Sequence, residues 1–208
     1  MTTYNQIAGH SVERLAALSD GVFAVAMTLL VLDLHAPAVD AIHGEHDLWL
    51  ALGALAPRLA MCAMTFITLG IFWVGQQTQL NHLSRSDRSL TWLHIFFLFA
   101  VSMTPFSTMM LAAFMTYRLA LLTYWVNILL LGWTLYLTWV CALGLGVVRE
   151  EIPPGVIAAI KRRIVIAQAL YAFGALLCLV STYVSIGWIV LVQLNYALAP
   201  RLPGRLRR

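Results

Sequence analysis

Thirty consecutive residues without a formal charge stand at positions 119–148: LALLTYWVNILLLGWTLYLTWVCALGLGVV. About 20 such residues form a helix long enough to cross the hydrocarbon core of a bilayer. The rest of the chain has the same character, because 61% of its 208 residues are apolar and only 11% are charged. A soluble domain carries about 25% charged residues. With a mean hydropathy of +0.83, the composition predicts an integral membrane protein and excludes disorder, a collagen-like chain, a coiled coil and a secreted disulfide scaffold.

Charged residues divide the remainder of the chain into further windows of this size. They are residues 14–34, the 26 residues between Arg58 and Arg85, residues 89–117 and residues 164–200. The last window would be roughly 55 Å long as one helix, so we expect it to fold back at the Ser-, Thr- and Gly-rich segment 181–187. None of the windows shows the period-two alternation of barrel strands. The prediction is an all-α membrane protein with six transmembrane helices in one domain, residues 1–208, the last two helices being short.

The connections between these spans alternate in charge. Ten basic residues lie in the second loop, the fourth loop and the carboxy-terminal tail, and one lies in the other loops: Arg85, Arg88, Arg149, Lys161, Arg162, Arg163, Arg201, Arg205, Arg207 and Arg208 against Arg118. Cytoplasmic loops of membrane proteins carry the excess of Lys and Arg. The pattern therefore predicts a multi-pass protein with both termini in the cytoplasm, and it requires an even number of spans.

Other classes of function find no support in the sequence. The net charge of +4 does not indicate a nucleic-acid partner, because the basic residues separate apolar runs instead of forming a patch. His43 and His46 lie among acidic residues in the first loop, but their spacing matches no zinc motif and a solvated loop is favoured. No catalytic motif is present, so we expect no enzyme, cofactor or metal site. Four polar residues in the late spans are expected to form interhelical hydrogen bonds: Asn127, Gln168, Gln193 and Asn195.

One face of the first predicted helix is an aliphatic stripe with one threonine. Val25, Thr28, Leu29 and Leu32 follow one another at helical spacing i, i+3, i+4 and i+7. Ordinary helix packing explains such a stripe, and by periodicity alone it is the favoured interpretation. The alternative is a pore wall, because aliphatic constrictions gate ion flow and hydroxyl groups replace part of an ion's hydration shell. Asp20 lies off this face, and a carboxylate near a membrane span needs a partner.

The segment around this stripe resembles the signature of the transmembrane protein 175 family, the lysosomal potassium channel and its bacterial relatives. That signature has Arg, then Phe-Ser-Asp after three residues, Thr-Leu-Leu after seven more, and a final Leu. The chain has the matching residues Arg14, Ser19, Asp20, Thr28, Leu29, Leu30 and Leu32, with Leu18 in place of Phe. Similar segments follow as Ile71-Phe72-Trp73, Asp87, Trp92-Leu93-His94 and TPFST at 104–108, whereas Gln76-Gln77 replaces a His pair of the family.

The resemblance implies a bacterial inner-membrane protein that forms a homotetramer, with the first helix of each subunit lining a central pore. Carried over to this chain, the pore constriction is Val25, Leu29 and Leu32, and Thr28 contributes to potassium selectivity. A structural network is implied for Arg14, Ser19 and Asp20, with Trp73 and His94 as partners of Asp20.

The function implied by the resemblance is a potassium-selective cation channel without the usual Thr-Val-Gly-Tyr-Gly filter, which this chain also lacks. Potassium ions and the lipid bilayer are its expected partners. Two alternatives remain open at this stage. One is a proton-permeable or weakly selective cation leak of the same architecture, and the other is a non-conducting carrier or scaffold.

Overall fold

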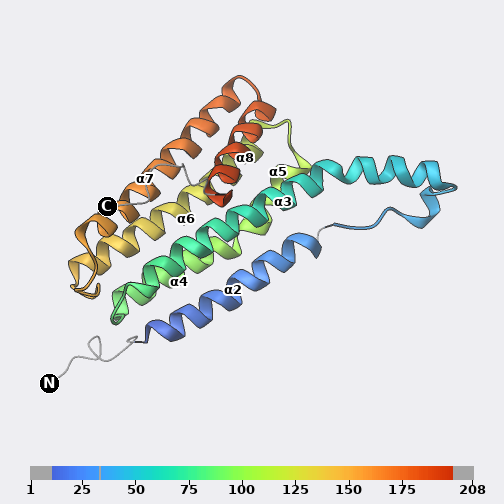
Figure 1. The fold of residues 1–208 in the computed structure, drawn as a ribbon. Coiled ribbons are helices and arrows are strands. Elements are labelled where there is room, and N and C mark those ends of the chain that lie inside the picture. Colours follow the sequence, from blue (N-terminus) through green and yellow to red (C-terminus); the bar gives the residue numbers. More distant parts are fainter. Residues whose placement is uncertain (1–10, 33, 199–208) are drawn as a thin grey trace.

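The computed structural model describes residues 11–32 and 34–198, and within them it is built from helices joined by short connections (Figure 1). The elements are α2 (Val12–Leu32), η1 (Val39–Ala41), α3 (Glu45–Asn81), α4 (Arg88–Ser102), α5 (Thr104–Ala113), α6 (Arg118–Gly144), α7 (Pro154–Leu176), η2 (Leu177–Leu179) and α8 (Thr182–Leu198). Five helical segments are long and apolar enough to span a membrane, with α4 and α5 counting as one, and α8 is a shorter apolar helix of 17 residues. The predicted all-α membrane architecture with six helices is confirmed.

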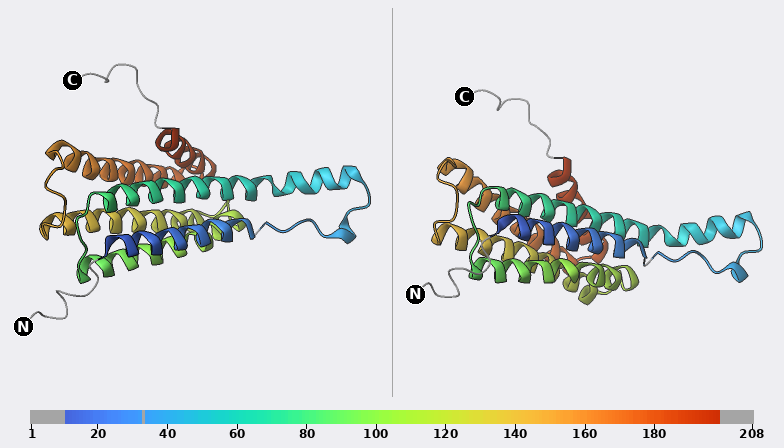
Figure 2. Two further views of the ribbon diagram at one scale, coloured as in Figure 1. Left: turned by 60° about the horizontal axis from the view of Figure 1, so that its bottom comes forward. Right: turned by 90° about the horizontal axis from the view of Figure 1, so that it is seen from below.

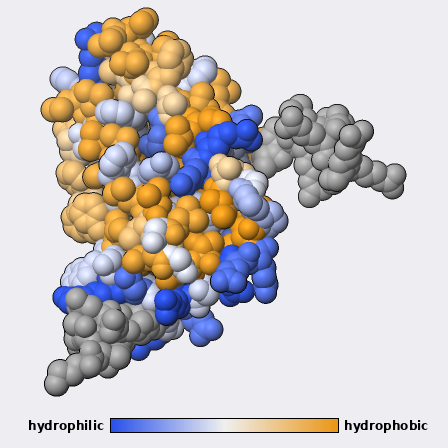
Figure 3. Space-filling model, turned by 90° about the vertical axis from the view of Figure 1, so that its left-hand side faces the viewer, coloured by the Kyte–Doolittle hydropathy of each residue, from blue (hydrophilic) through white to orange (hydrophobic). Residues whose placement is uncertain are grey.

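The helices run back and forth along one long axis, and the amino-terminal part of α3 extends beyond the ends of its neighbours (Figure 2). Hydrophobic residues also make up much of the outer surface (Figure 3). Large apolar side chains such as Trp133 and Leu191 are more than half exposed. A surface of this kind suits hydrocarbon and not water.

Two helices extend past the charged residues that border their uncharged windows. The second span begins at Glu45, so Pro57 lies about three turns inside α3 and not in its first turn, and Arg58 follows it. The fifth begins at Pro154, so the fourth-loop assignment of Lys161, Arg162 and Arg163 is wrong and these residues belong to α7. Long basic side chains reach the membrane surface from within a helix, so a charge marks the bilayer boundary and not the helix end.

The fold-back of the last window is confirmed, although it comes slightly earlier than predicted. The chain turns at Val180 and Ser181, after η2, and α8 starts at Thr182. Gly187, the last residue of the expected turn, lies inside α8.

The third span is broken between α4 and α5. Pro105 lies in the first turn of α5, and its ring and missing N–H prevent a continuous helix through Met103 and Thr104. The carbonyl of Ala100 at the break accepts a hydrogen bond from Asn127 Nδ2 of α6 (2.9 Å) and another from Thr104 Oγ1 (3.2 Å). The Ala100 carbonyl beside the break is therefore paired inside the protein, as a membrane interior favours.

Two loops are joined at one end of the bundle. The backbone N–H of Ser84 donates to Val147 (2.9 Å), and that of Arg149 donates to His82 (3.0 Å). The turn that allows this pairing includes Gly146, whose φ of 64° is unfavourable for other residues. The following helix α4 is capped by the carboxylate of Asp87, which accepts from the N–H of Leu90 (2.8 Å). The α3–α4 and α6–α7 loops thus lie at the same end.

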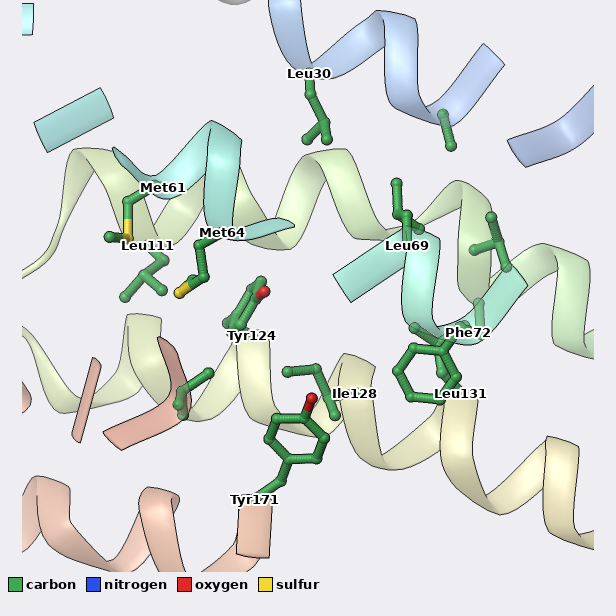
Figure 4. Close-up of a cluster of buried hydrophobic side chains, with 14 of the residues drawn as sticks. Leu30, Met61, Met64, Leu69, Phe72, Leu111, Tyr124, Ile128, Leu131 and Tyr171 are labelled. Carbon is green, nitrogen blue, oxygen red and sulfur yellow. The ribbon is translucent and has the colours of Figure 1, made fainter. Parts of the chain in front are cut away.

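The core is centred on α6 and reaches all its neighbours (Figure 4). Its largest buried side chains include Tyr124, Ile128 and Leu131 of α6, which are fully buried. They pack with residues of α3, α5 and α7, and Leu30 joins α2 to the same cluster. This packing fixes α2 and α3 against the bundle, so the remaining face of α2 has a defined direction.

The α7–α8 hairpin depends on a close approach at Gly174. A Cβ built there would lie 2.7 Å from Trp188 Cδ1 and 3.2 Å from Ile189 Cγ1, whereas one at Gly187 would meet nothing within 4 Å. We expect Gly174→Val to lower the free energy of unfolding by about 1–3 kcal/mol through overpacking. Thermal unfolding in detergent checks this, with Gly187→Val as the control. Equal destabilisation of both variants would contradict the role of the helix contact.

Candidate functional site

The helix α2 has two faces of different character. The face toward the bundle consists of Leu15, Ser19, Phe23, Ala26 and Leu30, all of them buried. They follow one another at steps of three and four residues, so they form one stripe along the helix. Because this stripe packs against α3 and α4, it orients the rest of α2 away from the bundle.

The opposite face is apolar and exposed in the single chain. Val25 is 57% exposed, Leu29 45% and Leu32 71%. Thr28 is exposed between them. A shallow groove of about 500 Å³ follows part of this face and includes Leu18 and Gly21. No charged side chain belongs to it, so the face is suited to contact another apolar surface or to line a narrow, poorly hydrated passage.

The hydroxyl of Thr28 has a defined polarity. Its Oγ1 donates to the carbonyl of Val25 at 2.8 Å. A threonine hydroxyl has one donor and two acceptor lone pairs. Since the proton is used within the helix, the oxygen presents its lone pairs to the exposed side, where they attract cations and not anions.

Asp20 lies beside α3. Its Oδ1 accepts two hydrogen bonds at 2.8 Å, one from Trp73 Nε1 and one from Gln77 Nε2. The two donors stand one helical turn apart on α3, so they meet the same oxygen. A single carboxylate therefore ties the first half of α2 to α3.

A second polar cluster lies one residue earlier and is completely buried. Ser19 Oγ and His94 Nε2 are 2.7 Å apart, and Gln76 Nε2 donates to Ser19 Oγ at 2.8 Å. These three residues come from α2, α4 and α3, so the cluster joins the three helices at one point. Hydrogen bonds in low dielectric favour one arrangement of the helices that they join, because breaking them is costly. Among the described residues, the second polar atom of Gln76, Oε1, has no partner.

The structure brings together only part of the expected network. Trp73 contacts Asp20, but His94 contacts Ser19 and not Asp20. Within residues 11–32 and 34–198, Arg14 forms no ion pair with Asp20; it is exposed, and its backbone N–H donates to Ser11 Oγ. Two members were missed, Gln76 and Gln77. Their positions three and four residues after Trp73 on one helix face were the available signal.

A third polar cluster lies deeper in the bundle. Tyr124 Oη is 3.0 Å from Thr68 Oγ1, which accepts from Gln193 Nε2 at 2.6 Å. Thr65 and Thr108 complete the cluster. Of the late polar residues, Asn127, Gln168 and Gln193 form interhelical hydrogen bonds, whereas Asn195 is exposed. Among the described residues no group of three His, Cys, Asp or Glu side chains could hold a metal ion.

Comparison with known proteins gives this arrangement a context. The family model described as "Endosomal/lysosomal potassium channel TMEM175" matches residues 14–105, from the start of α2 to the first turn of α5. A potassium channel of Streptomyces collinus is 41% identical over 102 residues, which are 49% of this chain and 48% of that protein. The human endosomal/lysosomal proton channel TMEM175 is 30% identical over 112 residues, 50% of this chain and 22% of that protein.

A solved structure extends the likeness to the whole fold. The crystal structure of a lysosomal potassium-selective channel TMEM175 homolog from Chamaesiphon minutus superposes with a TM-score of 0.79 and 25% identity, covering 90% of this chain and 97% of that one. In sequence, the chain spans about half or less of the curated relatives that it matches. Residues 14–105 are therefore similar in sequence to the TMEM175 family of potassium channels, and the fold of nearly the whole chain is similar to that of a TMEM175 homolog.

Proposed function

We propose that this protein is a potassium-selective cation channel formed by four copies of the chain around a common axis. The observation that carries the proposal is the exposed, uncharged face of α2 with Val25, Thr28, Leu29 and Leu32. The proposal is supported by the potassium-channel names of its bacterial relatives. A homotetramer would turn these faces toward one another and remove them from lipid.

The conduction path in this proposal is a short dry neck. Val25, Leu29 and Leu32 form successive apolar rings, through which an ion passes only after losing part of its water. Potassium loses water at a smaller free-energy cost than sodium. The four Thr28 oxygens, whose protons are held by Val25 carbonyls, replace part of the lost hydration. The potassium preference arises from these two effects together.

The wall of the neck must be rigid for such discrimination. The cytoplasmic half of α2 is held against the bundle on the side away from the pore. The contacts are the two hydrogen bonds to Asp20 and the buried cluster of Ser19, His94 and Gln76. In this proposal these residues position the pore helix and do not touch the ion.

We assign the protein to a bacterial inner membrane, with both termini in the cytoplasm. Arg85, Arg88 and Arg149 lie in or beside the two joined loops at one end of the bundle. Asp40, Glu45 and the other acidic residues of the first connection precede or begin α3 at the opposite end. The positive-inside rule makes the first end cytoplasmic. The four arginines of the carboxy-terminal tail, which also support this orientation in the sequence, lie outside the described residues: Arg201, Arg205, Arg207 and Arg208.

Reversal potentials of the purified protein in liposomes test the function. Under opposing potassium and sodium gradients, we expect a reversal potential close to the potassium equilibrium value. A potential that follows a proton gradient, or that treats both cations alike, would identify the proton-permeable or weakly selective leak instead; proton channels are the named function of the vertebrate relatives. Absence of any current would contradict a channel and leave a carrier or scaffold.

A further inference from the structure

An elongated cavity outside the candidate pore lies between α3 and α7. Its volume is about 320 Å³, within the range of ligand-binding pockets. Leu135 of α6 forms part of its floor, and Tyr196 of α8 borders it. Its lining is mostly apolar, with Phe72 and Ile164 among the residues. The cavity runs along the bundle from the start of α7 toward the middle of the membrane.

Three residues of the cavity lining carry a buried polar atom without a hydrogen-bond partner. Gln79 and Tyr171 line the cavity, and their side chains are 2% and 1% exposed. Among the described residues, Gln79 Oε1 and Tyr171 Oη have no hydrogen-bond partner, and neither has Gln168 Oε1 on the same wall. Each such atom costs about 1–3 kcal/mol when buried unpaired. A hydrocarbon occupant would leave all three unpaired, whereas an occupant with polar groups offers each a partner once its side chain turns toward the cavity.

A cation stands at the border of the cavity. The guanidinium of Arg163 lies over the ring of Tyr196, 5.4 Å from its centroid, and both residues line the cavity. This cation–π contact with Tyr196 favours the observed position of the Arg163 guanidinium. Lys161 and Arg162 precede it on α7. Arg163 and Tyr171 are eight residues apart, about 12 Å along the helix. The guanidinium of Arg163 is thus nearer the start of α7, and the unpaired hydroxyl of Tyr171 is farther along the helix.

We propose that this cavity binds an anionic glycerophospholipid of the adjacent leaflet. The phosphate pairs with Arg163, and an acyl chain fills the space beside Phe72 and Ile164. The ester groups lie along the wall that holds Tyr171 and the two glutamines, whose side chains turn to pair with them. Charge complementarity selects an anionic head group over a neutral one, because a basic cluster near the membrane surface attracts anionic lipids. This inference does not depend on the conducted ion.

Photo-labelling of the full-length protein tests the proposal. The protein is reconstituted in phosphatidylcholine vesicles that contain a phosphatidylglycerol probe with a photoreactive acyl chain, and the labelled peptides are identified by mass spectrometry. We expect labels on the cavity-lining parts of α3 and α7. Arg163→Gln should reduce this labelling about fivefold, the effect of one cation near a membrane surface. Arg162→Gln is the matched control, since Arg162 does not line the cavity, and should leave labelling unchanged.

A second pair of variants tests the cavity itself. Ala159 lines it and Ala158 does not. Ala159→Phe should reduce labelling, whereas Ala158→Phe should not, and gel filtration shows that both variants remain assembled. Equal labelling of this site by a phosphatidylcholine probe would overturn the anionic specificity. If α3 and α7 instead cross-link to a second copy and take up no lipid probe, the cavity is a subunit contact and the proposal fails.

Discussion

Replacing Leu29 by asparagine is expected to raise cation flux through the protein by about tenfold and to weaken its preference for potassium over sodium. Leu29 is the middle apolar position of the exposed α2 face. An amide at this ring lets water enter the neck, so ions lose less hydration there. A tenfold change corresponds to a barrier lowered by about 1.4 kcal/mol, a small part of the cost of dehydrating an ion.

The substitution leaves the protomer's own packing intact, because Leu29 is not part of the buried cluster. Leu191→Asn provides the matched control: Leu191 is 64% exposed on α8, far in sequence from the pore helix. Potassium and sodium flux assays in liposomes compare the two variants with the original protein. If Leu191→Asn and Leu29→Asn change flux equally, or Leu29→Asn changes nothing, α2 does not form the constriction.

The order of the apolar helical segments could be predicted because charge is costly in hydrocarbon. Each apolar window between charges contains one segment long enough to cross a membrane, and the window too long for a bilayer folds back into α7 and the shorter α8. Helix ends could not be predicted in the same way. Residues 45–57 continue α3 beyond Arg58, since backbone hydrogen bonds persist where the membrane ends. The break at Pro105 also lies within a single apolar window, and the sequence does not indicate that Asn127 of α6 donates to the Ala100 carbonyl beside it.

In the candidate site, too, some features could be predicted from the sequence and others could not. Helical periodicity separates Asp20 from the Val25–Leu32 stripe, and the structure agrees with that separation. Periodicity does not say which neighbour each polar residue meets. Ser19 and Asp20 are adjacent in sequence but differ by about 100° around the helix, so one reaches both α3 and α4 and the other only α3. Gln76 and Gln77 stand where the family has a His pair, and that likeness does not predict the hydrogen bonds that they donate to Ser19 and Asp20.

Replacing Asp20 by alanine is expected to reduce the assembled fraction of the protein about tenfold while leaving the ion preference of the remaining channels unchanged. The carboxylate oxygen accepts from both Trp73 and Gln77, so alanine removes two hydrogen bonds between α2 and α3. Hydrogen bonds to a charged group stabilise by about 1.5–3 kcal/mol each when well shielded. Asp20 is exposed in the single chain, so water weakens these hydrogen bonds. We therefore expect the lower end of this range, which corresponds to a change of about tenfold in the assembled fraction.

Asp20→Asn separates geometry from charge in this experiment. An asparagine Oδ1 still accepts from both α3 donors, so we expect assembly close to that of the original protein. Trp73→Phe keeps an aromatic side chain but removes the indole N–H donor, and the loss of assembly should be intermediate. Cross-linking and gel filtration in mild detergent measure the assembled fraction, and liposome reversal potentials measure ion preference. Normal assembly of Asp20→Ala with altered permeation ratios would instead place the carboxylate in the ion path, because a positioning residue held 2.8 Å from two α3 donors affects the ion only through the helix that it anchors.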